Sequence, residues 1–221
     1  MGAVVVAVLA WLVSTHNAAV DLDHDVAPWG LDHSSSSTRS VLRAVTRLGS
    51  GRTLVIALVA VGAVQLARKP RVGLAGFLVA ARLGESLLTS EAKNFVDRAR
   101  PTVAANASAL GPAFPSGHTA GAAACYAAIA IAVGIGLSRR TRALLLGGAV
   151  GVAVVVASSR VLLGVHWITD VVGGLALGWG WCALCVGVLR GALFDQADRS
   201  RSVGNLELAH DGRDMGANRR T

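Results

Sequence analysis

Long apolar runs recur six times along the chain, separated by short polar segments. They cover residues 2–20, 53–67, 71–89, 117–137, 143–159 and 169–189. A helix that crosses a membrane needs about 20 predominantly apolar residues, and within lipid a helix satisfies its own backbone hydrogen bonds. The pattern predicts an all-α polytopic membrane protein with six transmembrane helices in one domain, residues 1–190. Residues 191–221 are polar and lack periodicity, which predicts a disordered cytoplasmic tail.

The first apolar run is open to two interpretations. It is apolar to Val13 and then becomes polar through Ser14–Asn17. A cleaved signal peptide would normally carry a basic residue before the apolar stretch and a small-x-small cleavage site after it. Because neither is clear here, we expect a retained first helix, with cleavage as the alternative.

The composition agrees with a membrane protein and excludes several other classes. Hydrophobic residues make up 53% of the chain and charged residues 15%, against about 25% charged residues in soluble domains. A soluble enzyme, a disordered chain and a disulfide scaffold are therefore disfavoured. The net charge of +8 would suit nucleic acid, but the basic residues are spread between apolar runs, so we expect no nucleic-acid partner. The three cysteines, Cys125, Cys182 and Cys185, fall inside apolar runs and are expected to be packing residues.

Basic residues concentrate in the loops after the second and fourth runs and in the segment after the sixth. They are Arg68, Lys69, Arg71, Arg139, Arg140, Arg142, Arg190, Arg199 and Arg201. Such loops lie on the cytoplasmic side. We therefore predict a protein of the plasma (inner) membrane with both termini cytoplasmic. Segments 21–52, 90–116 and 160–168 would then face outward.

One outward segment carries basic residues of its own. Arg39, Arg43 and Arg47 recur at every fourth position, opposite apolar residues, after the serine run 34–37 that offers helix N-caps. This pattern predicts a short amphipathic helix that lies on the outer membrane face.

Three groups of polar residues interrupt the apolar sequence at helix ends. The first covers residues 93–101, the second 115–118, and the third 159–170. In the predicted topology all three lie on the outer side. Ionisable residues at such depths are candidates for function.

The three groups together contain what is needed to bind phosphate. Lys93, Arg100 and Arg160 supply cations, and arginine can hold phosphoryl oxygens through two parallel hydrogen bonds. Ser116 and Gly117 open the fourth run, where free backbone N–H groups and the helix dipole favour an anion.

Two histidines and a carboxylate accompany the cations. His166 and Asp170 are four residues apart, so on one helix the carboxylate could orient the imidazole. His118 offers a second imidazole for proton transfer. The set predicts a metal-free site of phosphoryl transfer.

Each group also has a plain structural interpretation. The basic residues of the first group could be interfacial side chains that reach toward water, residues 115–118 could be a helix start, and His166 with Trp167 could be an interfacial anchor. These interpretations weaken jointly, because all three groups are expected on one membrane face.

Two further polar clusters have simpler expectations. Arg82 and Glu85 are three residues apart in the third run and are expected to form a buried pair that holds helices together, with a contact to substrate as the alternative for Glu85. Asp21, Asp23 and Asp25 are spaced as in a calcium loop, but Val26 replaces the required glycine. A solvated acidic loop is the default expectation.

The three polar groups, in this order and spacing, resemble the signature of the type-2 phosphatidic acid phosphatase and vanadium haloperoxidase superfamily. The matching positions are Lys93, Arg100, Pro101, Pro115, Ser116, Gly117, His118, Ser159, Arg160, His166 and Asp170. The six-run pattern extends the resemblance to residues 2–190. It implies an all-helical membrane phosphatase that acts on lipid phosphates at the outer membrane surface, without metal or cofactor.

The resemblance also implies a role for each residue. His166 would be the nucleophile of a phosphohistidine intermediate and Asp170 its orienting carboxylate. His118 would protonate the leaving group and then activate water. Lys93, Arg100 and Arg160 would hold the phosphoryl oxygens, together with Ser116 and the Gly117 N–H.

The substrate class and the acceptor remain open at this stage. Polyprenyl diphosphate, phosphatidylglycerol phosphate and phosphatidic acid are all candidates. A phosphotransferase would use the same site with an acceptor other than water. A membrane scaffold or transporter is the rival outside enzymes, and it would have no need of His166.

Overall fold

The computed structural model describes residues 22–24, 26, 35–68, 72–101, 111–189 and 191. Every regular element in these ranges is helical, which confirms the all-α prediction. The elements, in chain order, are α3 (Ser36–Thr46), the short 3₁₀ helix η1 (Arg47–Gly49), α4 (Gly51–Arg68), α5 (Val72–Val96), α6 (Gly117–Gly134), α7 (Arg139–Leu162) and a last helix, Ile168–Leu189.

Five of these helices are long and apolar enough to cross a membrane: α4, α5, α6, α7 and Ile168–Leu189. They correspond to the second to sixth predicted runs. The predicted first span, 2–20, and the predicted tail from residue 192 onward lie outside the described residues, so the sixth span and the tail remain predictions.

One boundary was placed too early. The apolar run ends at residue 89, which puts Lys93 in the loop that follows. In the structure α5 continues to Val96, so Lys93 lies in its last turn. Hydropathy misses the end of α5 because Ser90, Glu91, Lys93 and Asn94 interrupt the apolar run, although all of them remain helical.

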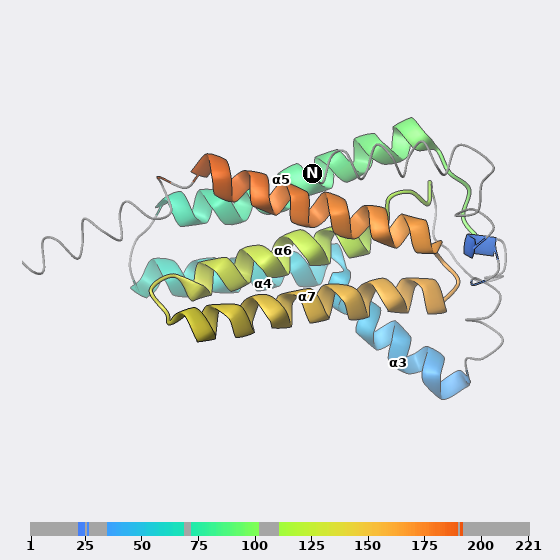
Figure 1. The fold of residues 1–221 in the computed structure, drawn as a ribbon, viewed down its shortest axis with the longest axis horizontal. Coiled ribbons are helices and arrows are strands. Elements are labelled where there is room, and N and C mark those ends of the chain that lie inside the picture. Colours follow the sequence, from blue (N-terminus) through green and yellow to red (C-terminus); the bar gives the residue numbers. More distant parts are fainter. Residues whose placement is uncertain are drawn as a thin grey trace, which may run out of the picture.

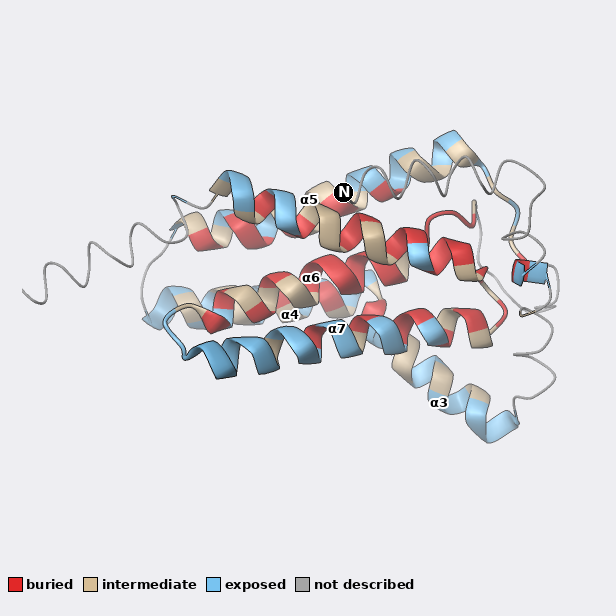
Figure 2. Ribbon diagram, viewed as in Figure 1, coloured by how far each residue is buried: buried red, intermediate tan, exposed pale blue. Residues whose placement is uncertain are grey.

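The long helices run side by side, and α6 is the most enclosed of them (Figure 1). Of its most apolar stretch, 61% is buried, against 11% for α4. Its many alanines allow close approach: a Cβ added at Gly178 of the last helix would lie 2.3 Å from the Ala120 carbonyl oxygen. Figure 2 shows buried residues along α6 and exposed ones on the outward side of α7, as expected for a helix facing lipid.

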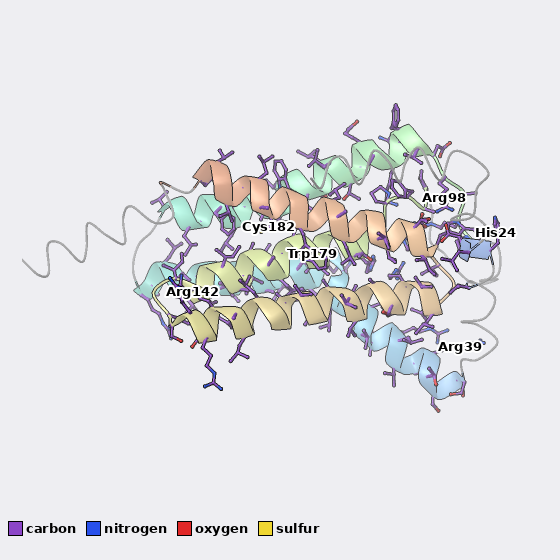
Figure 3. The ribbon with its side chains drawn as sticks, viewed as in Figure 1. His24, Arg39, Arg98, Arg142, Trp179 and Cys182 are labelled. Atoms are coloured by element: carbon purple, nitrogen blue, oxygen red, sulfur yellow. The ribbon has the colours of Figure 1, made fainter. Side chains whose placement is uncertain are left out.

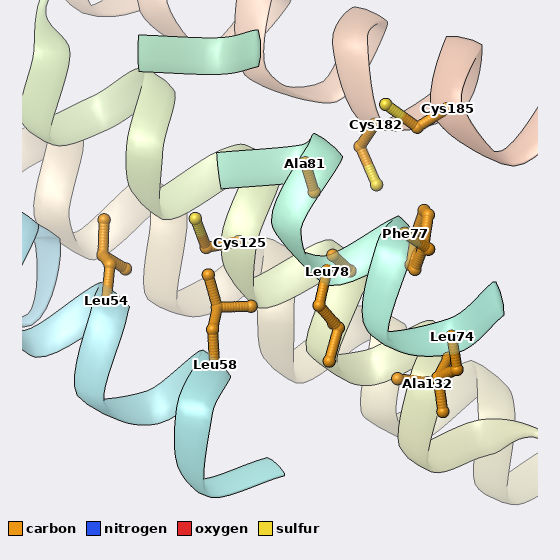
Figure 4. Packing of buried hydrophobic residues seen from close by; sticks show 11 residues of the cluster. Leu54, Leu58, Leu74, Phe77, Leu78, Ala81, Cys125, Ala132, Cys182 and Cys185 are labelled. Carbon is orange, nitrogen blue, oxygen red and sulfur yellow. The ribbon is translucent and has the colours of Figure 1, made fainter. Parts of the chain in front are cut away.

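A hydrophobic cluster joins α4, α5, α6 and the last helix (Figure 4). Its buried members are Leu54, Leu58, Leu74, Phe77, Leu78, Ala81, Cys125, Ala128, Ala132, Cys182 and Cys185. All three cysteines are free thiols within or against this cluster. The interpretation of the cysteines as packing residues is therefore confirmed.

The amphipathic segment forms helix α3 as predicted. The Ser35 hydroxyl caps it by accepting a hydrogen bond from the Thr38 backbone N–H at 3.1 Å, and none of its residues is buried. α3 leans away from the bundle at one end (Figure 1). Its position on the membrane surface remains a prediction.

The chain just after α3 is tied to the bundle. The Tyr126 hydroxyl donates to the Leu48 carbonyl oxygen at 3.0 Å. A Cβ at Gly49 would lie 2.7 Å from the His118 carbonyl oxygen, so only glycine fits there without a shift. Segment 46–49 therefore packs directly beside the start of α6.

Arg82 and Glu85 form the expected pair on α5. Arg82 Nη1 donates to Glu85 Oε2 at 2.9 Å, and Thr89 donates to the other carboxylate oxygen. The pair contacts other helices at its two ends, because a Cβ at Gly51 would meet Arg82 and one at Gly121 would meet Glu85. It therefore fills the space between α4, α5 and α6.

Candidate active site

The three polar groups of the sequence come together at one end of the bundle. Arg100 bonds His166, Ser116 bonds the Asp170 backbone, and Arg160 bonds Thr46 at the end of α3. Figure 3 shows Arg98 and His24 at this end and Arg142 at the opposite end. The predicted site residues and the basic first turn of α7 therefore lie at opposite ends of the helices.

His166 has one ring nitrogen on a carboxylate and the other on a guanidinium. Nδ1 lies 3.2 Å from Asp170 Oδ2, and Nε2 lies 3.0 Å from Arg100 Nη1. A guanidinium can donate but not accept. Nε2 must therefore be the acceptor and Nδ1 must carry the proton. This tautomer leaves the lone pair of Nε2 directed toward the basic side chains.

The path of the chain differs from the expectation that His166 and Asp170 share a helix. His166 lies in the turn between α7 and the last helix, where Gly164 has a positive φ of 66°. Asp170 belongs to the first turn of the last helix and accepts from the Trp167 backbone N–H at 3.0 Å. The carboxylate reaches back as a cap, and the imidazole is held before the helix rather than on it.

Burial sets the protonation state of the imidazole. His166 is 2% exposed. Its burial lowers the pKa of the imidazole to about 4, although the hydrogen bond to Asp170 raises it. The ring is therefore neutral near pH 7, which leaves Nε2 with a free lone pair.

Three cations, Lys93, Arg100 and Arg160, gather at this end of the bundle from separate elements. Arg100 donates to the carbonyl oxygens of Val165 at 2.9 Å, Gly111 at 2.9 Å and Pro112 at 3.3 Å. Lys93 also donates to the Pro112 carbonyl oxygen. Burial lowers the pKa of the Arg100 guanidinium, and the Asp170 carboxylate opposes this.

Arg160 completes the cationic set. Its Nη1 donates to Thr46 Oγ1 at 3.1 Å, and its Nε is buried without a hydrogen-bond partner among the described residues. Within the described part of the chain, neither Lys93, Arg100 nor Arg160 is paired with a carboxylate. Because the three repel one another, an anion bound between them would be strongly stabilised.

The start of α6 lies beside these cations. Ser116 is fully buried; its backbone N–H donates to the Asp170 carbonyl oxygen at 3.0 Å, and its hydroxyl oxygen accepts from Thr119 at 3.0 Å. No side chain caps α6. A Cβ at Gly117 would meet only the Thr89 methyl group, at an ordinary 3.5 Å. No protein neighbour in the described residues therefore requires glycine at 117, and its role toward phosphate remains a prediction.

Two residues of this end were missed by the sequence analysis. Arg98 lies inside the first polar group, and its guanidinium bonds Asp170 Oδ1 at 2.8 Å and Asp23 Oδ2 at 2.8 Å. The sequence signal that could have identified Arg98 is its position two residues before Arg100, inside the same polar group. Asp97 adopts a positive φ of 42° just after α5, which turns the chain so that residues 98–100 pass over the site.

The expectation of a solvated acidic loop is wrong for Asp23. Its side chain is 1% exposed and accepts from the Thr169 backbone N–H at 3.1 Å as well as from Arg98. Asp21 and Asp25 lie outside the described residues. No local pattern reveals this contact, because Asp23 and Thr169 are 146 residues apart.

Arg160→Lys is expected to lower turnover by about 100-fold, as does the loss of one preorganised donor to a transition state. Lysine keeps the charge but loses the planar fork that could serve Thr46 and phosphate together. The measurement is phosphate release by the purified variant, with Arg43→Lys on exposed α3 as the control. Near-normal turnover would make Arg160 a structural tie between α7 and α3.

Comparison with known proteins agrees with this geometry. The family model of the PAP2 superfamily matches residues 72–192. Phosphatidylglycerophosphatase B of Bacillus subtilis (strain 168) is 35% identical over 143 residues, which are 62% of this chain and 68% of that protein.

Two solved structures share the fold. The crystal structure of a transmembrane PAP2-type phosphatidylglycerolphosphate phosphatase from Bacillus subtilis has a TM-score of 0.77 and 28% identity, covering 83% of this chain and 91% of that one. The crystal structure of Aquifex aeolicus LpxE has a TM-score of 0.57 and 23% identity, and the match covers 75% of this chain and 95% of that one. This likeness concerns the fold alone.

The five apolar helices of the described residues, the cationic end with its histidine and these relatives together identify a membrane phosphatase. The chain belongs to the PAP2 superfamily, among its membrane lipid phosphatases. The resemblance inferred from the sequence is confirmed.

Proposed function

We propose that the protein hydrolyses a lipid phosphate or diphosphate through a phosphohistidine formed on His166, without a metal ion. One observation supports this above all. The lone pair of His166 Nε2 faces Arg100, in a group of three cations that have no carboxylate partner in the described residues.

In the first step Nε2 attacks the phosphorus atom of the bound phosphate. The bond from phosphorus to the lipid oxygen, or to the bridging oxygen of a diphosphate, breaks. His118 gives its proton to that leaving oxygen. Asp170, which accepts from Nδ1–H, stabilises the positive charge that develops on the imidazole. Arg100 moves its hydrogen bond from Nε2 to a phosphoryl oxygen.

In the second step water replaces the histidine. His118, now neutral, removes a proton from the water while its oxygen attacks phosphorus, and the bond to Nε2 breaks. Inorganic phosphate leaves and His166 returns neutral with its proton on Nδ1. Lys93, Arg100 and Arg160, together with the Ser116 hydroxyl and the Gly117 N–H, balance the phosphoryl charge in both steps.

The names of the relatives favour one of the three lipid classes. Two of them, from Bacillus subtilis, are named for phosphatidylglycerol phosphate. We propose this phosphomonoester as the first substrate to test, with phosphatidic acid and polyprenyl diphosphate as competitors.

The deciding experiment measures phosphate release from these three lipids in detergent by the purified protein. We expect release that vanadate inhibits and EDTA does not affect, with His166→Ala as the blank. Activity that EDTA abolishes and zinc or magnesium restores would contradict a metal-free reaction. Lipid consumed without free phosphate would indicate transfer to an acceptor other than water.

We further propose that the site end faces outward from the plasma membrane and that both termini are cytoplasmic. The first turn of α7 carries Arg139, Arg140 and Arg142 at the end opposite Arg98 (Figure 3), and basic segments that flank membrane spans stay inside. Residues 1–190 would form the membrane domain and 191–221 a cytoplasmic tail.

Cysteine labelling tests this orientation. With the native cysteines replaced, an impermeant reagent on intact cells is expected to label Asp97→Cys and Arg160→Cys but not Arg140→Cys. Asp97 and Arg140 are both exposed, so they form a matched pair. Labelling at 140 without labelling at 97 would place the site in the cytoplasm.

A further inference from the structure

We infer that Arg98 and Asp23 are positioning residues that hold the Asp170 carboxylate, and through it the His166 ring, in the orientation for attack. This inference rests on the proposed role of His166 as nucleophile. It concerns Asp170 Oδ1, the carboxylate oxygen that does not contact the histidine.

Each oxygen of Asp170 has its own partners. Oδ2 faces His166 Nδ1 at 3.2 Å and accepts from the Trp167 backbone N–H at 3.0 Å. Oδ1 accepts from Arg98 Nη1 at 2.8 Å. Because the two oxygens are held from two sides, the carboxylate cannot rotate away from the imidazole without breaking a charged hydrogen bond.

Arg98 is directed at this network and not at the phosphate-binding cations. Its Nη1 also donates to Thr169 Oγ1 at 2.6 Å, its Nη2 donates to Asp23 Oδ2 at 2.8 Å, and its guanidinium lies 5.4 Å from the centre of the Trp167 ring. Arg100, two residues later, instead contacts His166 Nε2. The two arginines of one motif therefore serve opposite sides of the same histidine.

Asp23 fixes this arginine to the last helix. Its Oδ1 accepts from the Thr169 backbone N–H at 3.1 Å, and its Oδ2 accepts from both the Thr169 hydroxyl and Arg98. The bond to a backbone N–H in the first turn is that of a helix cap. A residue that precedes α3 thereby fixes the turn that carries Asp170.

The charges of the network support the same conclusion. The side chains of Asp23 and Asp170 are fully buried, and that of Arg98 is 10% exposed. Removing Arg98 would leave the buried carboxylates of Asp23 and Asp170 without their shared cation. Removing the charge of Asp23 would leave the guanidinium to act on Asp170 alone, which weakens Asp170 as the acceptor for the imidazole. Both changes weaken the stabilisation by Asp170 of the positive charge that develops on the His166 imidazole.

The positioning role predicts a change in turnover rather than in binding. Asp23→Asn and Arg98→Lys are expected to lower kcat by about 10- to 100-fold, as small misplacements of a reacting group do. KM and inhibition by inorganic phosphate should change by less than about twofold, since neither residue touches the phosphate cations. Glu91→Gln, which changes an exposed carboxylate on α5, is the matched control and should leave kcat unchanged.

A double-mutant cycle separates positioning from general stability. In the Asp170→Asn background, Asp23→Asn should cost less than about twofold further, because its effect passes through the carboxylate already removed. Thr169→Val keeps the backbone N–H but removes the hydroxyl that joins Asp23 to Arg98, and it should lower kcat in the same direction. This variant gives a readout if Asp23→Asn does not fold.

The outcomes distinguish the inference from the proposed function. Unchanged kcat in Asp23→Asn and Thr169→Val, a loss confined to KM, or an undiminished loss in the Asp170→Asn background would overturn the positioning role. These results would leave the nucleophile in place as long as His166→Ala is inactive. An active His166→Ala would instead refute the proposed function.

Discussion

His166→Ala is expected to release no phosphate from any substrate and to retain no covalent phosphate. In the proposed mechanism both steps pass through Nε2, so an activated leaving group cannot bypass the loss. Loss of a nucleophile lowers turnover by about 10⁶-fold where it has been measured. The measurement is a rapid quench with ³²P-labelled substrate under alkaline conditions, which preserve a phosphoramidate bond.

His24→Ala provides the matched control for this experiment. The His24 ring lies at the same end and packs edge-on against Trp167, with 4.8 Å between ring centres. It makes no contact with the phosphate cations, so most activity should remain. Covalent label in the His166→Ala protein would show that another residue is the nucleophile.

His118→Ala is expected to discriminate between leaving groups. With a lipid alkoxide, loss of the general acid should lower turnover by about 100- to 10,000-fold. With p-nitrophenyl phosphate, whose phenolate leaves without a proton, the first step should recover in part. Because the same residue activates water, the phosphoenzyme should then accumulate.

Asp170→Asn serves as the comparison for the two histidine variants. The nucleophile remains but loses the carboxylate at 3.2 Å that orients it and stabilises its charge. Its activity should therefore lie between that of the wild-type protein and His166→Ala with every leaving group. Equal rescue of both histidine variants by p-nitrophenyl phosphate would show that their roles are wrongly assigned.

The fold could be predicted largely from hydropathy, because lipid leaves few alternatives to apolar helices. The ends of the helices could not. Lys93 looked like a loop residue, yet it lies within α5, since a helix can continue through polar residues beyond the apolar run. His166 looked like a helical residue, yet the turn at Gly164 places it before the last helix.

The site could be predicted where its residues lie in short motifs. The pairing of His166 with Asp170 follows from their spacing, and the structure brings Arg100 to the same ring. The contact of Asp23 with Arg98 could not be foreseen, because it joins residues 75 positions apart and no periodicity relates them. Long-range polar contacts of this kind become visible only in three dimensions.

The family match begins at residue 72, but two residues that hold the arginines of the site precede it. Asp23 holds Arg98, and Thr46 accepts the hydrogen bond of Arg160. A fragment cut at the start of the match would keep every signature residue and lose the partners of two arginines. The contacts that hold these two arginines therefore extend beyond the matched region, and truncated variants should begin before Asp23.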